Sequence, residues 1–218
     1  MKKTRVDGVE VSYSGDWIDV FESRQHFSWY WRQAKMVYDF CQKEESLLEL
    51  GKGTGCLSDI LRGKGWNIRT LDIDEDKKPD FCCDAYSFDY LSVSPDVLLA
   101  FEIFEHLPFE TFVKVISKIS VSGVRKIIFS VPWCERQLFG LSLKFPYFTR
   151  WDFYVPLNGR KILEPNHFWE LSTRDQGPLK KLNSLKEIFS NNGFSLSEVA
   201  KEGRIQFFCA VKGTDGRV

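Results

Sequence analysis

The sequence predicts an α/β fold built on a doubly wound, mostly parallel sheet, and three observations lead to this expectation. Leu47–Leu50 is a short apolar run that turns abruptly into glycines at alternate positions and then into a segment with helical spacing. The apolar runs 95–102 and 126–132 suit buried strands, and an amphipathic segment, 109–120, lies between them. Buried strands that alternate with helices are typical of a parallel sheet covered on both faces.

The glycines of the first strand–helix unit predict a ligand site. Gly51, Gly53 and Gly55 let the backbone turn tightly because glycine has no Cβ. Apolar residues at 57, 60 and 61 predict a helix directly after them, and 63–65 ends it. A helix N-terminus directs free N–H groups and partial positive charge at whatever lies over the turn. We therefore expect a ligand with a negative or hydrogen-bond-accepting end.

The glycine spacing excludes two common nucleotide motifs. A dinucleotide fingerprint would have its third glycine where Cys56 stands, and a phosphate-binding P-loop would not have its lysine at Lys52. An ordinary glycine-rich turn stays open as an alternative.

An acidic residue ends the second predicted strand, 66–72. In Rossmann-like folds, an acid at the end of a strand binds the ribose and lies roughly 20 residues after the glycine turn. Asp72 has a similar spacing from the glycines of this chain. A carboxylate can accept two hydrogen bonds from a vicinal diol. Asp74 is the second candidate, and the alternative is that both are surface residues of an acidic turn.

The next crossover is too short for a helix. Only 75–80 separates Asp74 from the third candidate strand, 81–85, whereas a parallel crossover normally needs a dozen or so residues. We expect this strand to be short and irregular or to lie at the sheet edge, with Asp84 near its end.

Several stretches resemble the motifs of one enzyme family. Segment 49–55 reads Glu-Leu-Gly-Lys-Gly-Thr-Gly and resembles the first motif of class I S-adenosylmethionine-dependent methyltransferases. Segment 96–108 resembles the motif at the fourth strand of that family. Segment 71–74 and the shortened crossover look like a type-11-like subgroup found with small-molecule and sugar-cluster enzymes. The resemblance extends over nearly all of the chain from Arg24 on.

The resemblance implies a fold, a cofactor and its contacts. The fold is a Rossmann-like, doubly wound, mostly parallel seven-stranded sheet with an antiparallel last strand, and 194–199 and 205–211 match its closing pair. The cofactor is S-adenosylmethionine. The positions that match the cofactor-binding residues of the family are Glu49, Gly51, Gly53, Gly55, Asp72, Ile73, Asp84, Ala85 and Phe101.

Three residues are candidates for catalysis. His106 invites a general-base role, but in the resembled motif the Glu-His pair generally holds the strand–helix junction by hydrogen bonds. Segment 165–171 resembles the His-x-Trp-Glu segment of the same subgroup, so His167 and Glu170 are the acceptor-side candidates. Either could instead be structural.

We expect a single domain, 1–218, with four parts: an N-terminal cap segment (1–45), a cofactor-binding half (46–131), an aromatic insert (132–170), and a C-terminal helix with closing strands (171–212).

The aromatic insert follows the fifth strand, so it starts at the carboxyl edge of the sheet, where ligands bind. We interpret it as a lid over the acceptor. The rival interpretations are a satellite hydrophobic cluster and a homodimer contact.

The cap segment contains a small predicted strand, 9–13, and a predicted helix, 24–41, with a wide aromatic face. Core packing is the favoured interpretation for most of these aromatics. Arg32 could meet a cofactor carboxylate, although a solvated arginine is the favoured interpretation.

Composition limits the partners. Lys+Arg and Asp+Glu are both 30, so no basic excess favours nucleic acid or an anionic membrane. No apolar run approaches the roughly 20 residues of a membrane span, and no apolar region follows the first residues. The six cysteines form no Cys-x-x-Cys pair, and no cluster of metal ligands is evident. We expect a reduced cytoplasmic protein that binds no metal.

The function implied by the resemblance is methyl transfer to an oxygen or nitrogen of a small-molecule or glycan acceptor. The alternative is a methyltransferase fold kept as a non-catalytic binding or assembly subunit, and the intact glycines with Asp72 and Asp84 argue against lost cofactor binding. An NAD-dependent oxidoreductase is disfavoured by the glycine spacing.

Overall fold

The computed structural model describes residues 2–13, 23–143, 151–161 and 164–213, and within 135–143 and 151–161 it describes the backbone. A seven-stranded sheet has the order β12-β13-β7-β6-β3-β4-β5. Its strands are β3 (Leu47–Leu50), β4 (Ile68–Asp72), β5 (Phe81–Cys82), β6 (Val97–Phe101), β7 (Lys126–Pro132), β12 (Phe194–Glu202) and β13 (Ile205–Lys212).

The sheet is parallel except at its last strand. β3 pairs in parallel with β4 and β6, and β6 pairs in parallel with β7. β13 is antiparallel to β7 and to β12. The predicted mostly parallel, seven-stranded sheet with an antiparallel last strand is therefore confirmed.

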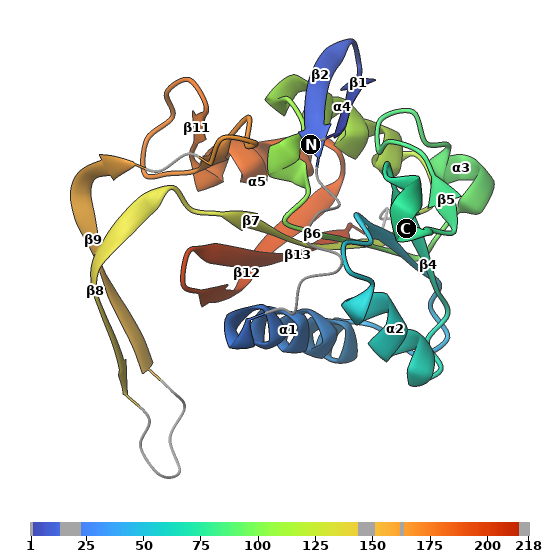
Figure 1. Cartoon of the computed structure of the whole chain (residues 1–218), viewed down its shortest axis with the longest axis horizontal. Helices are drawn as coiled ribbons and strands as arrows, with labels where there is room; N and C mark the ends of the chain where they lie inside the picture. Colours follow the sequence, from blue (N-terminus) through green and yellow to red (C-terminus); the bar gives the residue numbers. More distant parts are fainter. Residues whose placement is uncertain (1, 14–22, 144–150, 162–163, 214–218) are drawn as a thin grey trace, which may run out of the picture.

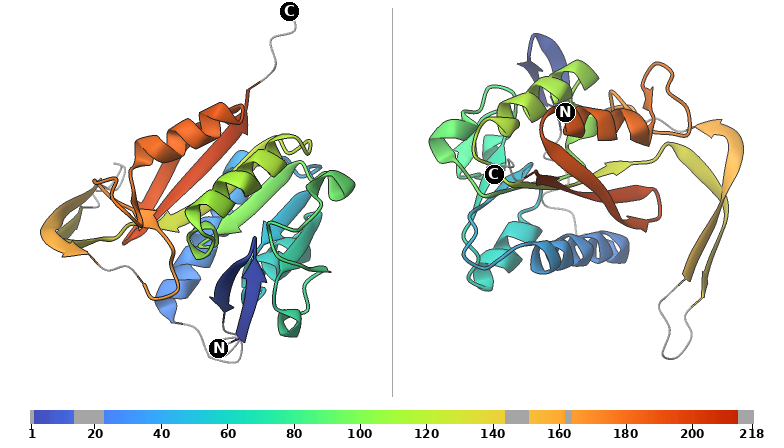
Figure 2. Two further views of the ribbon diagram at one scale, coloured as in Figure 1. Left: turned by 90° about the horizontal axis from the view of Figure 1, so that it is seen from above. Right: turned by 180° about the vertical axis from the view of Figure 1, so that it is seen from behind.

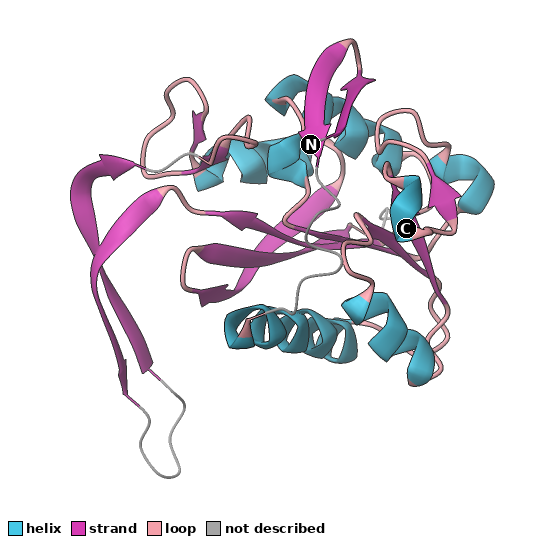
Figure 3. Cartoon of the chain, in the orientation of Figure 1, coloured by secondary structure: helices cyan, strands magenta, loops and turns pink. Residues whose placement is uncertain are grey.

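Helices cover both faces of the sheet (Figures 1 and 3). On one face lie α1 (Arg24–Phe40) and α2 (Cys56–Gly63). On the other lie α4 (Phe109–Ser120) and α5 (Leu182–Asn191), with the short α3 (Tyr90–Val93) beside them. None of the described helices combines the length and apolar character that a membrane span requires.

Each face has its own hydrophobic core. The side chains of β3 and β6 alternate between the cores, which explains why both strands are apolar except at Glu49: Leu48 and Leu98 pack with α4 and α5, and Leu47 with α1 and α2. Stacked and tilted rings dominate the α4–α5 side, where Phe129 lies 5.1 Å from Phe189 between ring centroids.

The shortened crossover has the predicted consequence. A single 3₁₀ turn, η1 (Glu75–Lys77), replaces the helix, and the two-residue strand β5 pairs with the end of β4 at the sheet edge. The third strand is thus both short and at the edge.

The N-terminus forms a hairpin that the sequence predicted only in part. The expected strand β2 (Val9–Tyr13) pairs with β1 (Lys2–Val6), which was missed. Val6 and Val11 join the core on the α4 side, and Asp7 accepts hydrogen bonds from Thr111 and Lys114 of α4. The N-terminal hairpin lies near the ends of the strands from which β7 continues into the β8–β9 hairpin (Figure 2).

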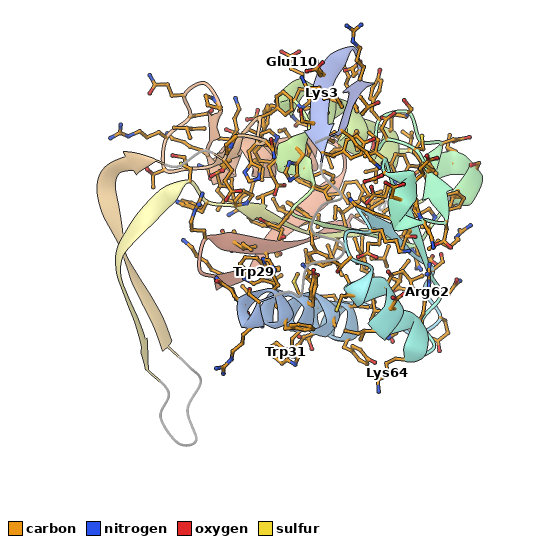
Figure 4. All side chains as sticks on the ribbon, viewed as in Figure 1. Lys3, Trp29, Trp31, Arg62, Lys64 and Glu110 are labelled. Atoms are coloured by element: carbon orange, nitrogen blue, oxygen red, sulfur yellow. The ribbon has the colours of Figure 1, made fainter. Side chains whose placement is uncertain are left out.

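Helix α1 corrects one interpretation. Core packing holds for Trp29 and Phe40 but is wrong for Trp31, which is 59% exposed. Trp29 packs against the core and points toward the sheet, whereas Trp31 points away from it (Figure 4). Arg32 Nε lies 2.6 Å from a carboxylate oxygen of Glu202, so an ion pair with β12 replaces the expected solvated arginine.

The aromatic insert contains a long antiparallel hairpin, β8 (Glu135–Leu143) with β9 (Trp151–Lys161). The hairpin extends from the body of the molecule beside β12 and α5 (Figures 1 and 2). The expected side-chain roles of the aromatic and basic residues in 135–163 lie outside what the structure describes. The lid over the acceptor therefore stays a prediction.

Candidate active site

The glycine turn between β3 and α2 has the backbone conformation that only glycine adopts readily. Gly51, Gly53 and Gly55 have φ angles of 73°, 57° and 82°. A Cβ on Gly51 would stand 1.9 Å from the Cδ1 atom of Ile103, so the turn also lies in close contact with the segment after β6. Tyr30 of α1 hydrogen-bonds to Thr54 at 3.2 Å and closes the other side of the turn.

Asp72 lies beside this turn, as the sequence predicted. One carboxylate oxygen is 3.4 Å from the amide of Gly53, the other accepts the amide of Asp74 at 2.9 Å, and Lys77 Nζ is 3.1 Å away. Asp72 is 4% exposed and Asp74 is 1% exposed, so the alternative of two surface aspartates is wrong. Asp74 forms an ion pair with Lys2 at 2.6 Å, which leaves Asp72 as the residue directed at the turn.

Glu49 is a buried acid at the end of β3. Its side chain is 5% exposed, and Oε2 has no hydrogen-bond partner among the described residues. Burial raises the pKa of this carboxyl to about 8, and a hydrogen bond from Ser58 opposes the shift. A cationic group of a ligand beside the turn would give Glu49 the partner that it lacks.

The other predicted cofactor residues follow neighbouring strands. Asp84 is half-buried, and one of its oxygens accepts the amides of Tyr86 at 2.9 Å and Ser87 at 2.8 Å. Ala85 and Ile73 are half-buried, and Phe101 ends β6. All these residues therefore belong to the carboxyl ends of the parallel strands, the edge at which α/β folds bind ligands.

A strained residue follows β6. Glu102 has a φ angle of 54°, which is uncommon for a residue with a side chain. Its amide donates to Ser130 of β7, and the hydroxyl of Ser130 donates to the Glu102 carboxylate at 2.8 Å. Burial raises the pKa of Glu102 to about 7. No pattern in the sequence indicated that Ser130 would be the partner of Glu102.

The catalytic candidates His106 and His167 meet although they are far apart in the chain. His106 ends the 3₁₀ turn η2 (Phe104–His106), and its ring lies 4.8 Å from the ring of His167. The indole N–H of Trp169 donates to the Phe104 carbonyl at 3.0 Å and the amide of Phe168 donates to the Glu105 carbonyl at 2.8 Å. These two bonds hold segment 164–171 against η2.

Glu170 accepts hydrogen bonds that hold His167 and anchor its own side chain. Its Oε1 accepts His167 Nδ1 at 2.7 Å and the Glu164 amide at 3.1 Å, and its Oε2 accepts Arg204 at 3.0 Å. Glu170 is fully buried. The geometry makes it a positioning residue for His167, which is the structural alternative left open by the sequence.

The expectation that Glu105 and His106 secure the strand–helix junction is wrong for the Glu105 side chain. Glu105 is fully buried, and neither carboxylate oxygen accepts a hydrogen bond from another described residue. Burial raises the pKa of Glu105 well above its usual value, and the neighbouring Glu102 raises it further. His106 instead bonds through Nδ1 to the Asn166 carbonyl at 3.1 Å, and burial lowers its pKa to about 4. His106 is therefore neutral at pH 7.

Comparisons with known proteins support the fold. Neither protein-family models nor curated protein sequences match this chain. Among solved structures, magnesium protoporphyrin IX methyltransferase (ChlM) from Synechocystis PCC 6803 with bound SAM has a TM-score of 0.55 and 16% identity over 87% of this chain and 80% of that chain. The glycopeptide N-methyltransferase MtfA with S-adenosyl-L-homocysteine has a TM-score of 0.55 and 12% identity over 84% of this chain and 89% of that chain.

A third similar structure is the small RNA methyltransferase HEN1, with a TM-score of 0.57 and 13% identity over 95% of this chain and 28% of that chain. This chain has the class I S-adenosylmethionine-dependent methyltransferase fold. The resemblance predicted from the sequence is thus confirmed for the fold. The class I methyltransferases just described are named for a porphyrin, a glycopeptide and an RNA, so the fold does not determine the acceptor.

Proposed function

We propose that this protein transfers a methyl group from S-adenosylmethionine to an oxygen or nitrogen of a small-molecule or glycan acceptor. The observation that carries the proposal is the glycine turn with three left-handed φ angles, with the buried carboxylate of Asp72 against the Gly53 amide. Within a class I methyltransferase fold, this combination suits a ligand that has both an amino-acid end and a ribose.

The described residues fit the cofactor. The turn from Gly51 to Gly55 lets the amino-acid portion of the cofactor approach the backbone closely. Oε2 of Glu49, which has no hydrogen-bond partner among the described residues, suits the ammonium group of that portion. Asp72 suits the ribose diol, and Asp84 suits the adenine amino group, with Ile73 and Ala85 flanking the adenine.

Chemical roles follow from the same edge of the sheet. When bound, S-adenosylmethionine supplies a methyl group on an electrophilic sulfonium. Phe101 offers an aromatic face that tolerates a nearby cation. His167 is held by Glu170, so its Nε2 offers a lone pair on the acceptor side, able to take a proton or bind a cation. Alignment of acceptor and methyl supplies much of the rate enhancement in such a site.

In our proposal, the acceptor enters between His167 and the β8–β9 hairpin. The hairpin follows β7 directly, so it starts from the ligand-binding edge of the sheet. A homodimer contact through the hairpin is the rival role. Solution scattering separates the two, because a monomer at working concentration would remove the dimer role.

The proposal is tested by methyl transfer from labelled S-adenosylmethionine to a panel of hydroxylated sugars, nucleotide sugars, amino compounds and a short RNA. Transfer to a small molecule or glycan supports the proposal, and exclusive transfer to the RNA contradicts its acceptor class. Tight cofactor binding with no transfer to any acceptor, by a protein whose fold is intact, would favour the non-catalytic binding subunit.

A further inference from the structure

Three metal-ligating side chains meet just beyond the end of β6. Glu105 and His106 belong to η2, and His167 belongs to the segment after the β8–β9 hairpin; one ligand atom from each lies within 4.8 Å of the others. We propose that Glu105, His106 and His167 bind a divalent first-row transition-metal ion, whose remaining coordination positions take a hydroxyl oxygen of the methyl acceptor. The second part of the proposal rests on the proposed function, and the first part does not.

Nδ1 of both histidines is engaged in a hydrogen bond. Nδ1 of His106 lies 3.1 Å from the Asn166 carbonyl, and a carbonyl can only accept, so the proton is on Nδ1. Nδ1 of His167 lies 2.7 Å from Oε1 of Glu170, whose other oxygen accepts a hydrogen bond from Arg204. These bonds leave Nε2 of each ring with a lone pair, the form in which imidazole binds metal.

Glu105 supplies the independent sign of a missing cation. A fully buried carboxylate whose two oxygens have no partner in the described structure is costly and rare in native proteins. A bound divalent ion would satisfy it. The neighbouring acidic residues also favour a cation at this place, because Glu102 and Glu164 are close enough to Glu105 to affect it electrostatically.

The outer contacts have the organisation of a metal site. Glu170 orients His167 while Arg204 and the Glu164 amide fix both Glu170 oxygens. Carboxylate–histidine–metal arrangements of this kind set the tautomer and the ring orientation. These contacts use Nδ1 of His167, so Nε2 is the nitrogen that remains for an ion.

The donor set indicates the class of ion. Two imidazoles and one carboxylate favour Mn²⁺, Fe²⁺, Co²⁺ or Zn²⁺ over Ca²⁺ and Mg²⁺, which prefer oxygen ligands throughout. Three protein ligands leave positions open for an exogenous oxygen, as in catalytic metal sites.

The location connects the ion with the acceptor. Ile103, two residues before Glu105, is the side chain that a Cβ on Gly51 would strike, so η2 begins against the glycine turn. An acceptor hydroxyl bound to the ion would be held near the cofactor and would lose its proton more readily. The inference therefore narrows the acceptor to one with a hydroxyl group and the reaction to O-methylation.

The test measures ion binding by the whole, untagged protein without cofactor or acceptor. The protein is treated with chelator, freed of it, and titrated with Mn²⁺, with free Mn²⁺ followed by electron paramagnetic resonance. Mn²⁺ is preferred to Zn²⁺ as the probe because exposed Cys82 could bind zinc. We expect one ion per chain, and no displacement by a hundredfold excess of Ca²⁺.

The variants Glu105→Gln, His106→Gln and His167→Gln should each weaken Mn²⁺ binding by more than the 10–100-fold typical for loss of an outer contact, and Glu170→Gln by about that range. His26→Gln is the matched control, because His26 is the chain's remaining histidine and lies on α1. It should bind Mn²⁺ like the wild type.

Thermal unfolding distinguishes a ligand from a structural residue. At a hundredfold excess over Kd, Mn²⁺ should raise the wild-type melting temperature by about 5–10 °C. Glu105→Gln should melt at or above the wild-type temperature without metal, because the wild-type side chain makes no hydrogen bond to another described residue that the change would break, and it should show no Mn²⁺ shift. A structural role for Glu105 predicts a lower melting temperature and an unchanged Mn²⁺ affinity, which would overturn the proposal.

Absence of Mn²⁺ binding by the wild type up to millimolar concentration would also overturn it. The acceptor part has its own readout: methyl transfer that is equally fast after chelation would refute coordination of the acceptor while leaving an ion site in place. Mn²⁺ binding without methyl transfer to any acceptor would instead contradict the proposed function alone.

Discussion

Glu49 gives a quantitative prediction about cofactor binding. Its carboxyl is buried, one oxygen has no hydrogen-bond partner within the described part of the chain, and its pKa is raised to about 8 because burial disfavours the charge. If the ammonium group of S-adenosylmethionine lies beside Glu49, the opposite charge should return the pKa toward its ordinary value of about 4.5. Binding of the cofactor should then release a proton.

The amount released follows from the pKa. At pH 7, a group with a pKa of about 8 is about nine-tenths protonated, so complete ionisation releases about 0.9 proton per site. At pH 9, where Glu49 is already mostly ionised, its release should fall to about 0.1 proton.

Isothermal titration calorimetry in buffers of different ionisation enthalpy measures this release directly. The ligand amino group also titrates near pH 8, so the informative quantity is the difference between the wild type and Glu49→Gln, which keeps the shape and cannot ionise. The difference should approach one proton at pH 6 and shrink toward pH 9. Equal proton release by the two proteins at every pH would refute the assignment of Glu49 to the ammonium group.

Further predictions follow from the same site. Because the folded-state pKa of Glu49 is raised, its contribution to stability is complete below about pH 4.5 and lost as pH rises through about 8, so ligand-free Glu49→Gln should melt higher than the wild type only in alkaline buffer. Asp72→Ala should weaken cofactor binding roughly tenfold or more through loss of charge-assisted hydrogen bonds, with Asp74→Asn as control; an unchanged dissociation constant removes Asp72 from the site. Gly53→Val, at a φ of 57°, should abolish cofactor binding while melting temperature falls modestly, and normal binding would make the loop a simple turn. His167→Ala should lower kcat about 10²–10⁴-fold without changing cofactor affinity, and a rise in KM alone would assign it to acceptor positioning.

Local signals made the fold predictable. The strands 47–50, 97–101 and 126–132 carry apolar residues on both faces because each lies between two cores. The glycines need left-handed φ angles that other residues resist. The crossover after Asp74 was too short for anything but a turn. In these segments sequence pattern and tertiary environment agree.

The features that were missed depend on contacts between distant segments. Nothing near His106 in the sequence indicates that His167 will stand beside it, and no pattern reveals that Glu105 will be buried without a partner. β1 is mostly exposed, and so lacked the apolar pattern of a strand. Trp31 of α1 shows that a helical pattern of aromatic residues can also mislead, because this aromatic residue is exposed and does not face the core.

Binding of the cofactor itself is the most direct test of the account. Calorimetric titration of the purified protein with S-adenosylmethionine, S-adenosylhomocysteine and NAD should give saturable binding of one S-adenosyl ligand per chain and no binding of NAD, because the glycine turn has the spacing of the former site and lacks the third glycine of a dinucleotide fingerprint at Cys56. Tight binding of NAD, with no heat from either S-adenosyl ligand, would contradict the central claim.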